Sequence, residues 1–224
     1  MKLSKVSIKR LILLLFAIAC LIPAMPAAAG PEGPSRAEAL AALKKSDPEA
    51  RRRGAFALAT AGRMSDTPDL AAALRDDDER VRAIAEEALW AVWSRSGEAR
   101  VDDLLAQGVA QMSARRFPEA IATFTRIVEL KPDFAEGWNK RATVYFLAGE
   151  YQRSLKDCDE VIKRNPQHFG ALSGYGQIYL KHGQTEKALE YFRRALTVNP
   201  NLEGVQALVE ELEARRAARL RKTI

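Results

Sequence analysis

The chain has 224 residues, of which 47% are hydrophobic and 29% are charged, and its formal charge at pH 7 is +6. Four of the positive charges lie in a segment of 29 residues without acidic side chains, so removal of that segment leaves +2 (6 − 4). So small a surplus excludes the strongly basic class of nucleic-acid-binding proteins.

Residues 1–29 have the three parts of a secretory signal. A positive start precedes an apolar run, residues 11–22, and a short segment that ends in three alanines before Gly30. We therefore expect cleavage after Ala29 and export across the inner membrane into the bacterial periplasm. The cleaved chain keeps Cys158 as its one cysteine and can form no internal disulfide. The residues concerned are Lys2, Lys5, Lys9 and Arg10 at the start and Ala27, Ala28 and Ala29 at the end.

Two alternatives stay open for this segment. An uncleaved segment would anchor the protein in the membrane, although a membrane-spanning helix needs roughly 20 apolar residues and residues 11–22 supply 12. Acylation at Cys20 would make a lipoprotein, but the preceding Ala17, Ile18 and Ala19 lack the usual leucine.

A Gly/Pro-rich linker, residues 30–35, precedes a repeat with a period of 31 in residues 36–97. Asp47 and Asp78 occupy the same place in the two copies, as do Arg51 and Arg82. The pattern resembles the short HEAT-like repeats of phycobilin lyases. The resemblance implies helix pairs whose second helices are capped by the aspartates. It also implies that each arginine binds an acid of the neighbouring repeat. The full set of matched positions is Leu43, Asp47, Arg51, Ala57 and Leu58, then Leu74, Asp78, Arg82, Ala88 and Leu89.

Two such units are too few for a stable stack, because stacked repeats need about three. We therefore expect them to dock on the following segment, with Trp90 and Trp93 as filler of the joint.

Residues 98–202 carry a second repeat, with a period of 34, in the units 101–134, 135–168 and 169–202. Small residues, aromatic residues and prolines recur at that spacing. The pattern resembles the tetratricopeptide repeat (TPR), a helix–turn–helix unit that stacks into a solenoid. We expect helices over residues 101–114, 135–148 and 169–181, each crossed closely by a second helix, and Asp133 and Asn201 as helix caps. The matched positions are Gly108, Ala142 and Gly176; Ala120, Ser154 and Ala188; Phe124, Cys158 and Phe192; Leu104, Trp138 and Leu172; and Pro132, Pro166 and Pro200.

Resemblance to TPR proteins implies that a peptide or protein partner binds in a concave groove lined by the first helix of each unit. The family's carboxylate clamp is missing, because its positions here read Leu105, Val109, Lys140, Gly170 and Gly174. The residues expected to face this groove and touch the partner are Asn139, Thr143, Ser173 and Gln177, with Lys140 at its rim.

Residues 203–224 form a capping helix with a basic tail. Val205, Leu208, Val209 and Leu212 recur at helical spacing and predict one apolar stripe against the last repeat. The fold class predicted for the whole is an all-α, right-handed solenoid of antiparallel helix pairs.

No catalytic, phosphate-binding or metal-binding motif occurs, so we expect neither an enzyme nor a cofactor or metal. The function expected is a scaffold or adaptor of the bacterial cell envelope, with a protein or peptide partner and no nucleic acid. One alternative is a HEAT-like lyase or tetrapyrrole-binding protein, for which residues 36–97 supply no Cys or His. Another is a membrane-anchored or lipid-anchored assembly factor, with membrane contact through residues 11–22 or the basic tail.

Overall fold

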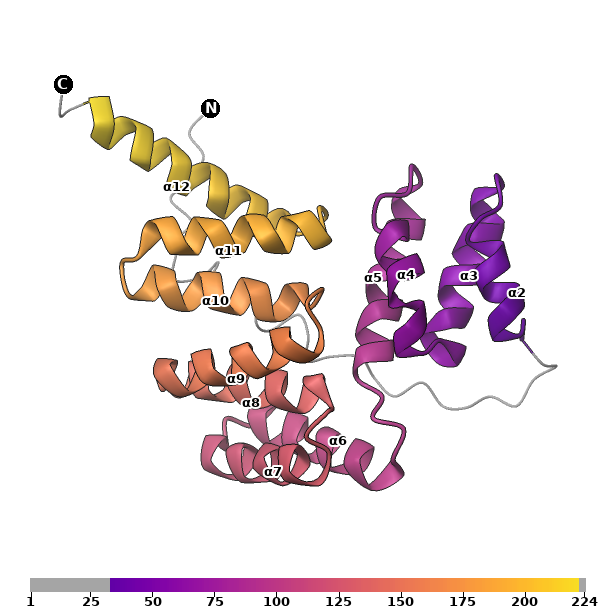
Figure 1. Cartoon of the computed structure of the whole chain (residues 1–224), viewed down its shortest axis with the longest axis horizontal. Coiled ribbons are helices and arrows are strands. Elements are labelled where there is room, and N and C mark those ends of the chain that lie inside the picture. Colours follow the sequence, from indigo (N-terminus) through magenta and orange to yellow (C-terminus); the bar gives the residue numbers. More distant parts are fainter. Residues whose placement is uncertain (1–32, 222–224) are drawn as a thin grey trace. The chain divides into compact units, whose positions relative to one another are not determined.

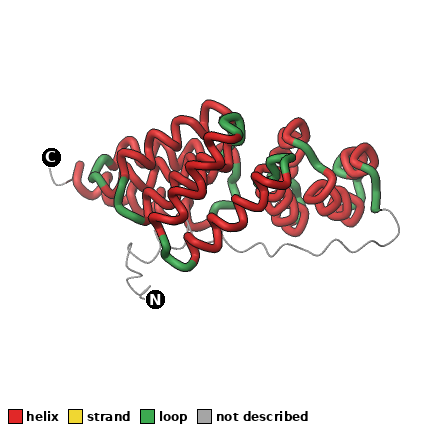
Figure 2. The backbone as a smooth tube through the Cα atoms, turned by 90° about the horizontal axis from the view of Figure 1, so that it is seen from below, coloured by secondary structure: helices red, strands yellow, loops and turns green. Residues whose placement is uncertain are grey.

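A computed structural model describes residues 33–221, and every regular element in that range is a helix (Figures 1 and 2). The predicted signal segment with its apolar run and Cys20, and the last residues of the basic tail, lie outside the described residues. No described helix is long and apolar enough to cross a lipid bilayer. The chain divides into two compact units, the first built from residues 33–102 and the second mainly from residues 103–221.

The first unit consists of two helix pairs. α2 packs on α3, α4 packs on α5, and α3 packs on α5, which makes the two pairs into one layered body. A glycine lets the first pair approach closely, because a Cβ atom on Gly54 would lie 2.7 Å from the Ala39 carbonyl oxygen. The elements are α2 (Arg36–Ala42), α3 (Pro48–Ala61), the 3₁₀ turn η2 (Met64–Asp66), α4 (Thr67–Ala73) and α5 (Glu79–Trp93).

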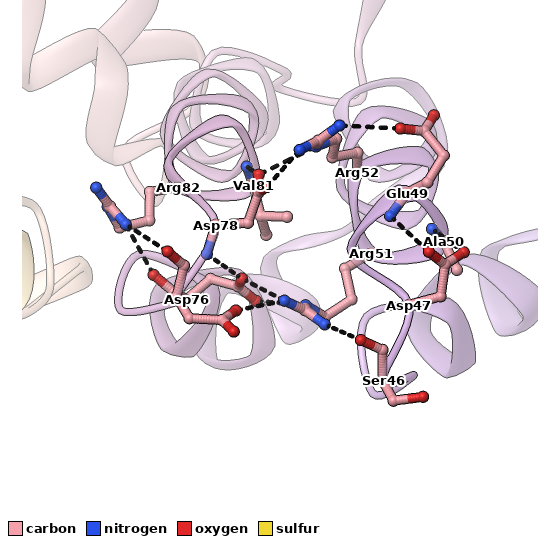
Figure 3. A network of polar contacts seen from close by, with 11 residues as sticks. Ser46, Asp47, Glu49, Ala50, Arg51, Arg52, Asp76, Asp78, Val81 and Arg82 are labelled. Carbon is pink, nitrogen blue, oxygen red and sulfur yellow. Dashed lines mark hydrogen bonds and ion pairs between the residues drawn. The ribbon is translucent and has the colours of Figure 1, made fainter.

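The predicted caps of this unit are confirmed, and so is the contact of Arg51 with an acid of the neighbouring repeat. Arg82 does not follow the prediction, because its Nε donates to the amide oxygen of Asn201 at 3.1 Å and not to a carboxylate. Asp47 accepts the backbone N–H groups of Glu49 and Ala50, and Asp78 accepts that of Val81 at 2.9 Å. Arg51 donates to both carboxylate oxygens of Asp76, each at 2.7 Å, so it joins the first helix pair to the second (Figure 3).

Arg51 and Arg82 also make equivalent hydrogen bonds to the loops that precede their helices. Each donates from Nη1 to the carbonyls five and six residues earlier, Ser46 and Lys45 in one case, Asp77 and Asp76 in the other. The period of 31 is therefore a repeat of structure as well as of sequence.

The second unit is a stack of helix pairs followed by one further helix (Figure 1). Within it α8 packs on α9, α10 packs on α11, and each pair also contacts the next. This arrangement confirms the predicted all-α solenoid. The elements are α6 (Ala99–Ser113), α7 (Phe117–Leu130), α8 (Ala135–Leu147), α9 (Tyr151–Arg164), α10 (Phe169–Lys181), α11 (Thr185–Val198) and α12 (Glu203–Arg221).

The final helix α12 is the predicted cap. Its apolar stripe is buried together with Ala188, Leu189 and Phe192 of α11, in one hydrophobic cluster. Burial of that stripe closes the apolar end of the stack, as the spacing predicted. The stripe consists of Val205, Leu208, Val209 and Leu212.

The helix crossings show one detail that the prediction left open. A Cβ atom on Gly176 would lie 2.4 Å from Phe192 Cε1, and one on Gly108 would lie 2.5 Å from Phe124 Cε1. Each glycine therefore lies against the aromatic ring of the second helix, a contact that the expected close crossing did not specify. The middle repeat has Ala142 in place of the glycine and packs it with Cys158 in one cluster.

Two further predictions are wrong in position. Asp133 and Asn201 lie two residues before the starts of α8 and α12, so each is one residue too early to be an N-cap. Trp138, which occupies the repeat position of Leu104 and Leu172, is only partly buried, and the guanidinium groups of Arg141 and Arg164 lie over its ring at 4.9 and 4.8 Å. An indole half in water is a favourable surface for such cations.

Candidate functional site

The five predicted partner-binding residues lie on α8 and α10, the first helices of the second and third repeats. All five are buried, with exposed fractions of 1% for Gln177 and 5–7% for the others. The prediction that they face outward is therefore wrong, and so is the placement of Lys140 at a rim. The other four are Asn139, Lys140, Thr143 and Ser173.

A buried carboxylate, that of Glu136, explains the position of Lys140. Lys140 Nζ lies 3.0 Å from Glu136 Oε1, one helical turn away on α8. Asn139 Nδ2 donates to the other oxygen, Oε2, at 3.1 Å. A lysine is buried at acceptable cost only where an opposite charge compensates it, and Glu136 supplies that charge.

His168 ties this carboxylate to the next repeat. Its Nδ1 accepts the backbone N–H of Ala171 at 3.1 Å and so caps α10, which leaves the ring proton on Nε2. Nε2 lies 3.0 Å from Glu136 Oε2 and therefore donates to it. One ring thus fixes the start of α10 and holds α8 beside it.

The surroundings keep Glu136 ionised. Burial by itself raises the pKa of this carboxyl, but the charge of Lys140 and the hydrogen bond from His168 outweigh it and lower the pKa to about 2. A carboxylate with so low a pKa is a poor general base at neutral pH. The cluster therefore holds α8 and α10 together, and its carboxylate is not suited to act as a general base.

Gln177 is a buried polar residue of α10 whose side-chain acceptor lacks a hydrogen-bond donor in the described part of the chain. Its Oε1 has no hydrogen-bond partner among the residues that the structure describes. A buried acceptor without a donor costs roughly 1–3 kcal/mol. A donor brought by another molecule would remove that cost.

Sequence reasoning missed Glu136 and His168. A signal for the first was present, because Glu136 and Lys140 are an i, i+4 pair on the helix that carries the predicted site. No sequence signal indicated that His168, 32 residues further on, would complete the cluster. Lys140, the one cation among the positions that correspond to the family's clamp, lies 3.0 Å from a carboxylate oxygen of Glu136.

Other chemistry-bearing residues fit a structural role. Cys158 is buried, and burial together with the neighbouring Asp157 raises the pKa of its thiol, so it is not an activated nucleophile. In the described part of the chain no three His, Cys, Asp or Glu side chains gather as a metal site would require.

Comparison with known proteins agrees with this fold. Residues 133–201 match the family model described as "Tetratricopeptide repeat". A TPR repeat-containing protein of Rhizobium etli is 34% identical over 144 residues, which cover 62% of this chain and 70% of that protein. The chain belongs to the tetratricopeptide repeat family, whose members mediate protein–protein interaction.

Other relatives are matched over smaller parts of their own length. Hsp70-Hsp90 organizing protein 1 of Glycine max is 26% identical over 50% of this chain, but the match spans 20% of that protein. Among solved structures, the first TPR domain of Spaghetti (RPAP3), bound to an HSP90 peptide, superposes with a TM-score of 0.50 at 20% identity, covering 52% of this chain and 93% of that one. The Sgt2 TPR domain of Aspergillus fumigatus superposes with a TM-score of 0.52 at 18% identity, covering 55% and 83%. These structures share the fold, and no enzyme family is among the relatives described.

Proposed function

We propose that this protein is a non-catalytic adaptor of the bacterial cell envelope, which binds a peptide or protein partner through α8 and α10. Membership of a family of interaction modules supports the binding role. The signal-like pattern of residues 1–29 supports the location, together with the absence of any Asn-x-Ser/Thr acceptor in the sequence. We also propose that residues 36–97 form HEAT-like repeats.

The side-chain oxygen of Gln177, which lacks a donor within the described chain, is the observation that supports the proposed binding site. A structural role would satisfy this buried amide within the protein, as it does the neighbouring Thr143, whose hydroxyl donates to the Asn139 carbonyl at 2.9 Å. The Gln177 Oε1 instead lacks a donor among the described residues. A partner that supplies a backbone N–H would complete it, with Ser173 one helical turn away as a second contact.

Capture from cells tests the proposal. The full-length chain, tagged at its carboxyl terminus, is cross-linked in intact bacteria and purified from the envelope fraction. We expect one envelope protein to be retained by the wild-type chain and by Gln167→Leu, which changes an exposed amide on the same unit. Capture should fall with Gln177→Leu. Recovery of the chain from the cytoplasmic fraction would contradict the location, and equal capture by both variants would contradict the site.

A further inference from the structure

A hollow surface lies on the first unit. α3 and α5 border a cavity of about 920 Å³, closed at one end by Gly33 and Pro34. This volume lies within the range of ligand pockets. Phe56 lines it with 57% of its surface exposed, more than any other large apolar side chain in the described chain.

The floor and the rim of this cavity differ in character. Phe56, Ala57 and Ile84 supply apolar surface from the two helices. Three arginines and one glutamate stand around them, which leaves two positive charges in excess (3 − 1). An apolar floor within a basic rim fits a ligand that is apolar at one point and acidic on either side of it. The four charged residues are Arg52, Arg53, Arg80 and Glu49.

The arginines are not equally engaged. Arg52 is held by Asp78 and by Glu49, as Figure 3 shows, and is therefore part of the scaffold. Arg53 is 63% exposed and its nearest carboxylate oxygens are 3.7 and 3.9 Å away, which makes weak pairs. Arg80 is exposed and forms no ion pair with another described residue. The guanidinium group of Arg80 and the weakly paired one of Arg53 can thus receive carboxylates.

The positive surface continues beyond the first cavity. A neighbouring cavity of about 600 Å³ shares Gly33, Pro34 and Arg53 with it and adds Lys45. Its one acid, Glu38, is engaged in the capping box of Ser35. An extended chain could therefore run across both cavities and meet positive charge along its whole length.

We infer that the cavity between α3 and α5 binds an acidic peptide segment of a partner protein. One large apolar side chain of the peptide packs against Phe56, and flanking Asp or Glu side chains bind Arg80 and Arg53. The surface does not fit a nucleic acid, which needs a broad basic face, because Arg53 and Arg80 border an apolar floor formed by Phe56, Ala57 and Ile84. Anionic membrane is likewise disfavoured, because Phe56 lines a hollow instead of projecting from a flat apolar face.

Selection from random peptides tests this directly. Seven-residue peptides displayed on phage are selected on the purified full-length protein, and enriched sequences are synthesised and titrated. We expect enriched peptides to carry one aromatic or large aliphatic residue flanked by Asp or Glu. Substituting Asp and Glu by Asn and Gln in the best peptide should weaken binding about tenfold or more.

Variants with exposed side chains locate the site without threatening the fold. Phe56→Ala and Arg80→Glu should each raise the Kd of the selected peptide about tenfold or more. Their matched controls are Met64→Ala, another exposed apolar residue of this unit, and Arg100→Glu, an exposed arginine outside the cavity, and both should leave Kd unchanged.

Three results would overturn the inference. The first is enrichment without acidic residues, or no enrichment at all. The second is equal binding by Phe56→Ala and by the wild-type protein. The third is binding to phosphatidylglycerol vesicles that depends on Phe56 and Arg80 while no peptide does, which would assign the surface to a membrane. None of these results depends on Gln177, so the inference stands or falls apart from the proposed function.

Discussion

The three repeats solve the same packing problem with different pairs of residues. Gly108 faces Phe124 and Gly176 faces Phe192, whereas Ala142 shares its cluster with Cys158. A larger residue on the first helix is thus matched by a smaller one on the second. Close packing in protein interiors makes such volumes interdependent.

This interdependence makes a prediction for the third repeat. Gly176→Ala places a methyl group 2.4 Å from the Phe192 ring and should lower the free energy of unfolding by about 1–3 kcal/mol. The double variant Gly176→Ala with Phe192→Cys copies the middle repeat, so its loss should be smaller than the sum of the two single losses. Urea denaturation of all four proteins measures the coupling, and strictly additive losses would refute it.

The buried ion pair of Glu136 and Lys140 makes a prediction about pH. Glu136→Gln removes the carboxylate charge that lies 3.0 Å from the buried Lys140 ammonium group and should cost about 3–5 kcal/mol at pH 7. The pKa of Glu136 is lowered from 4.5 to about 2, so its stabilisation is present above pH 4.5 and is lost as pH falls towards 2. The difference between wild type and variant should therefore shrink across that interval.

Denaturation at several pH values checks this, with Glu150→Gln as the control. Glu150 pairs with Arg153 at 2.6 Å on the surface of the same unit, and its loss should cost less than about 1 kcal/mol. If the difference in unfolding free energy between the wild type and Glu136→Gln stays constant down to pH 2, the Glu136 carboxylate is not the source of the stability.

At the scale of the element, the turns between the helices of each repeat share one backbone conformation. Gly149 and Gly183 have φ values of 81° and 70° and follow α8 and α10. Arg115 takes the same place after α6, with a φ of 58°. The left-handed region costs a residue with a Cβ atom roughly 1–2 kcal/mol, a cost that glycine avoids.

Arg115→Gly should therefore raise the stability of the first repeat by about 1 kcal/mol, after allowance for the greater freedom of glycine in the unfolded chain. Arg116→Gly is the control, since φ is −81° there and glycine brings no relief. Thermal melting should place Arg115→Gly above the wild type and Arg116→Gly at or below it; the reverse order would contradict the argument.

Elements were predicted better than individual contacts. The period of 34 places the first helices within about two residues of α6, α8 and α10, because apolar spacing and prolines both mark them. Asp133 failed as a cap because its offset from the proline turn depends on backbone geometry that spacing does not encode. The buried cluster of Glu136 and His168 was not predicted for a similar reason, because these residues meet only in the folded chain and no local sequence pattern connects them.

At the scale of the whole molecule, the fate of residues 1–29 can be read from a mass. Intact-protein mass spectrometry of the envelope fraction should show a chain that begins at Gly30. A chain that retains residues 1–29 would establish the membrane anchor. A chain that begins at a lipid-modified Cys20 would establish the lipoprotein. Either result would replace the soluble periplasmic form of the proposal.

The first helices of the repeats, on which the proposed site lies, bury polar side chains. α10 is buried at every residue from Ala171 to Ile178 although it contains serine and glutamine. Sequence periodicity assigned those polar residues to an outer face, because it assumes that polar side chains face water. Their burial, together with the Gln177 Oε1 that lacks a donor among the described residues, is the observation on which the proposed binding site rests.

The most direct test of the central claim measures stability and binding in one variant, Gln177→Leu. Replacing an unsatisfied buried acceptor by an apolar group of similar size should leave the free energy of unfolding unchanged or raise it. The same change should raise the Kd of the captured partner about tenfold or more, because the partner's donor loses its acceptor. Unchanged Kd in a protein that melts at or above the wild-type temperature would contradict the claim that α8 and α10 hold the partner through Gln177.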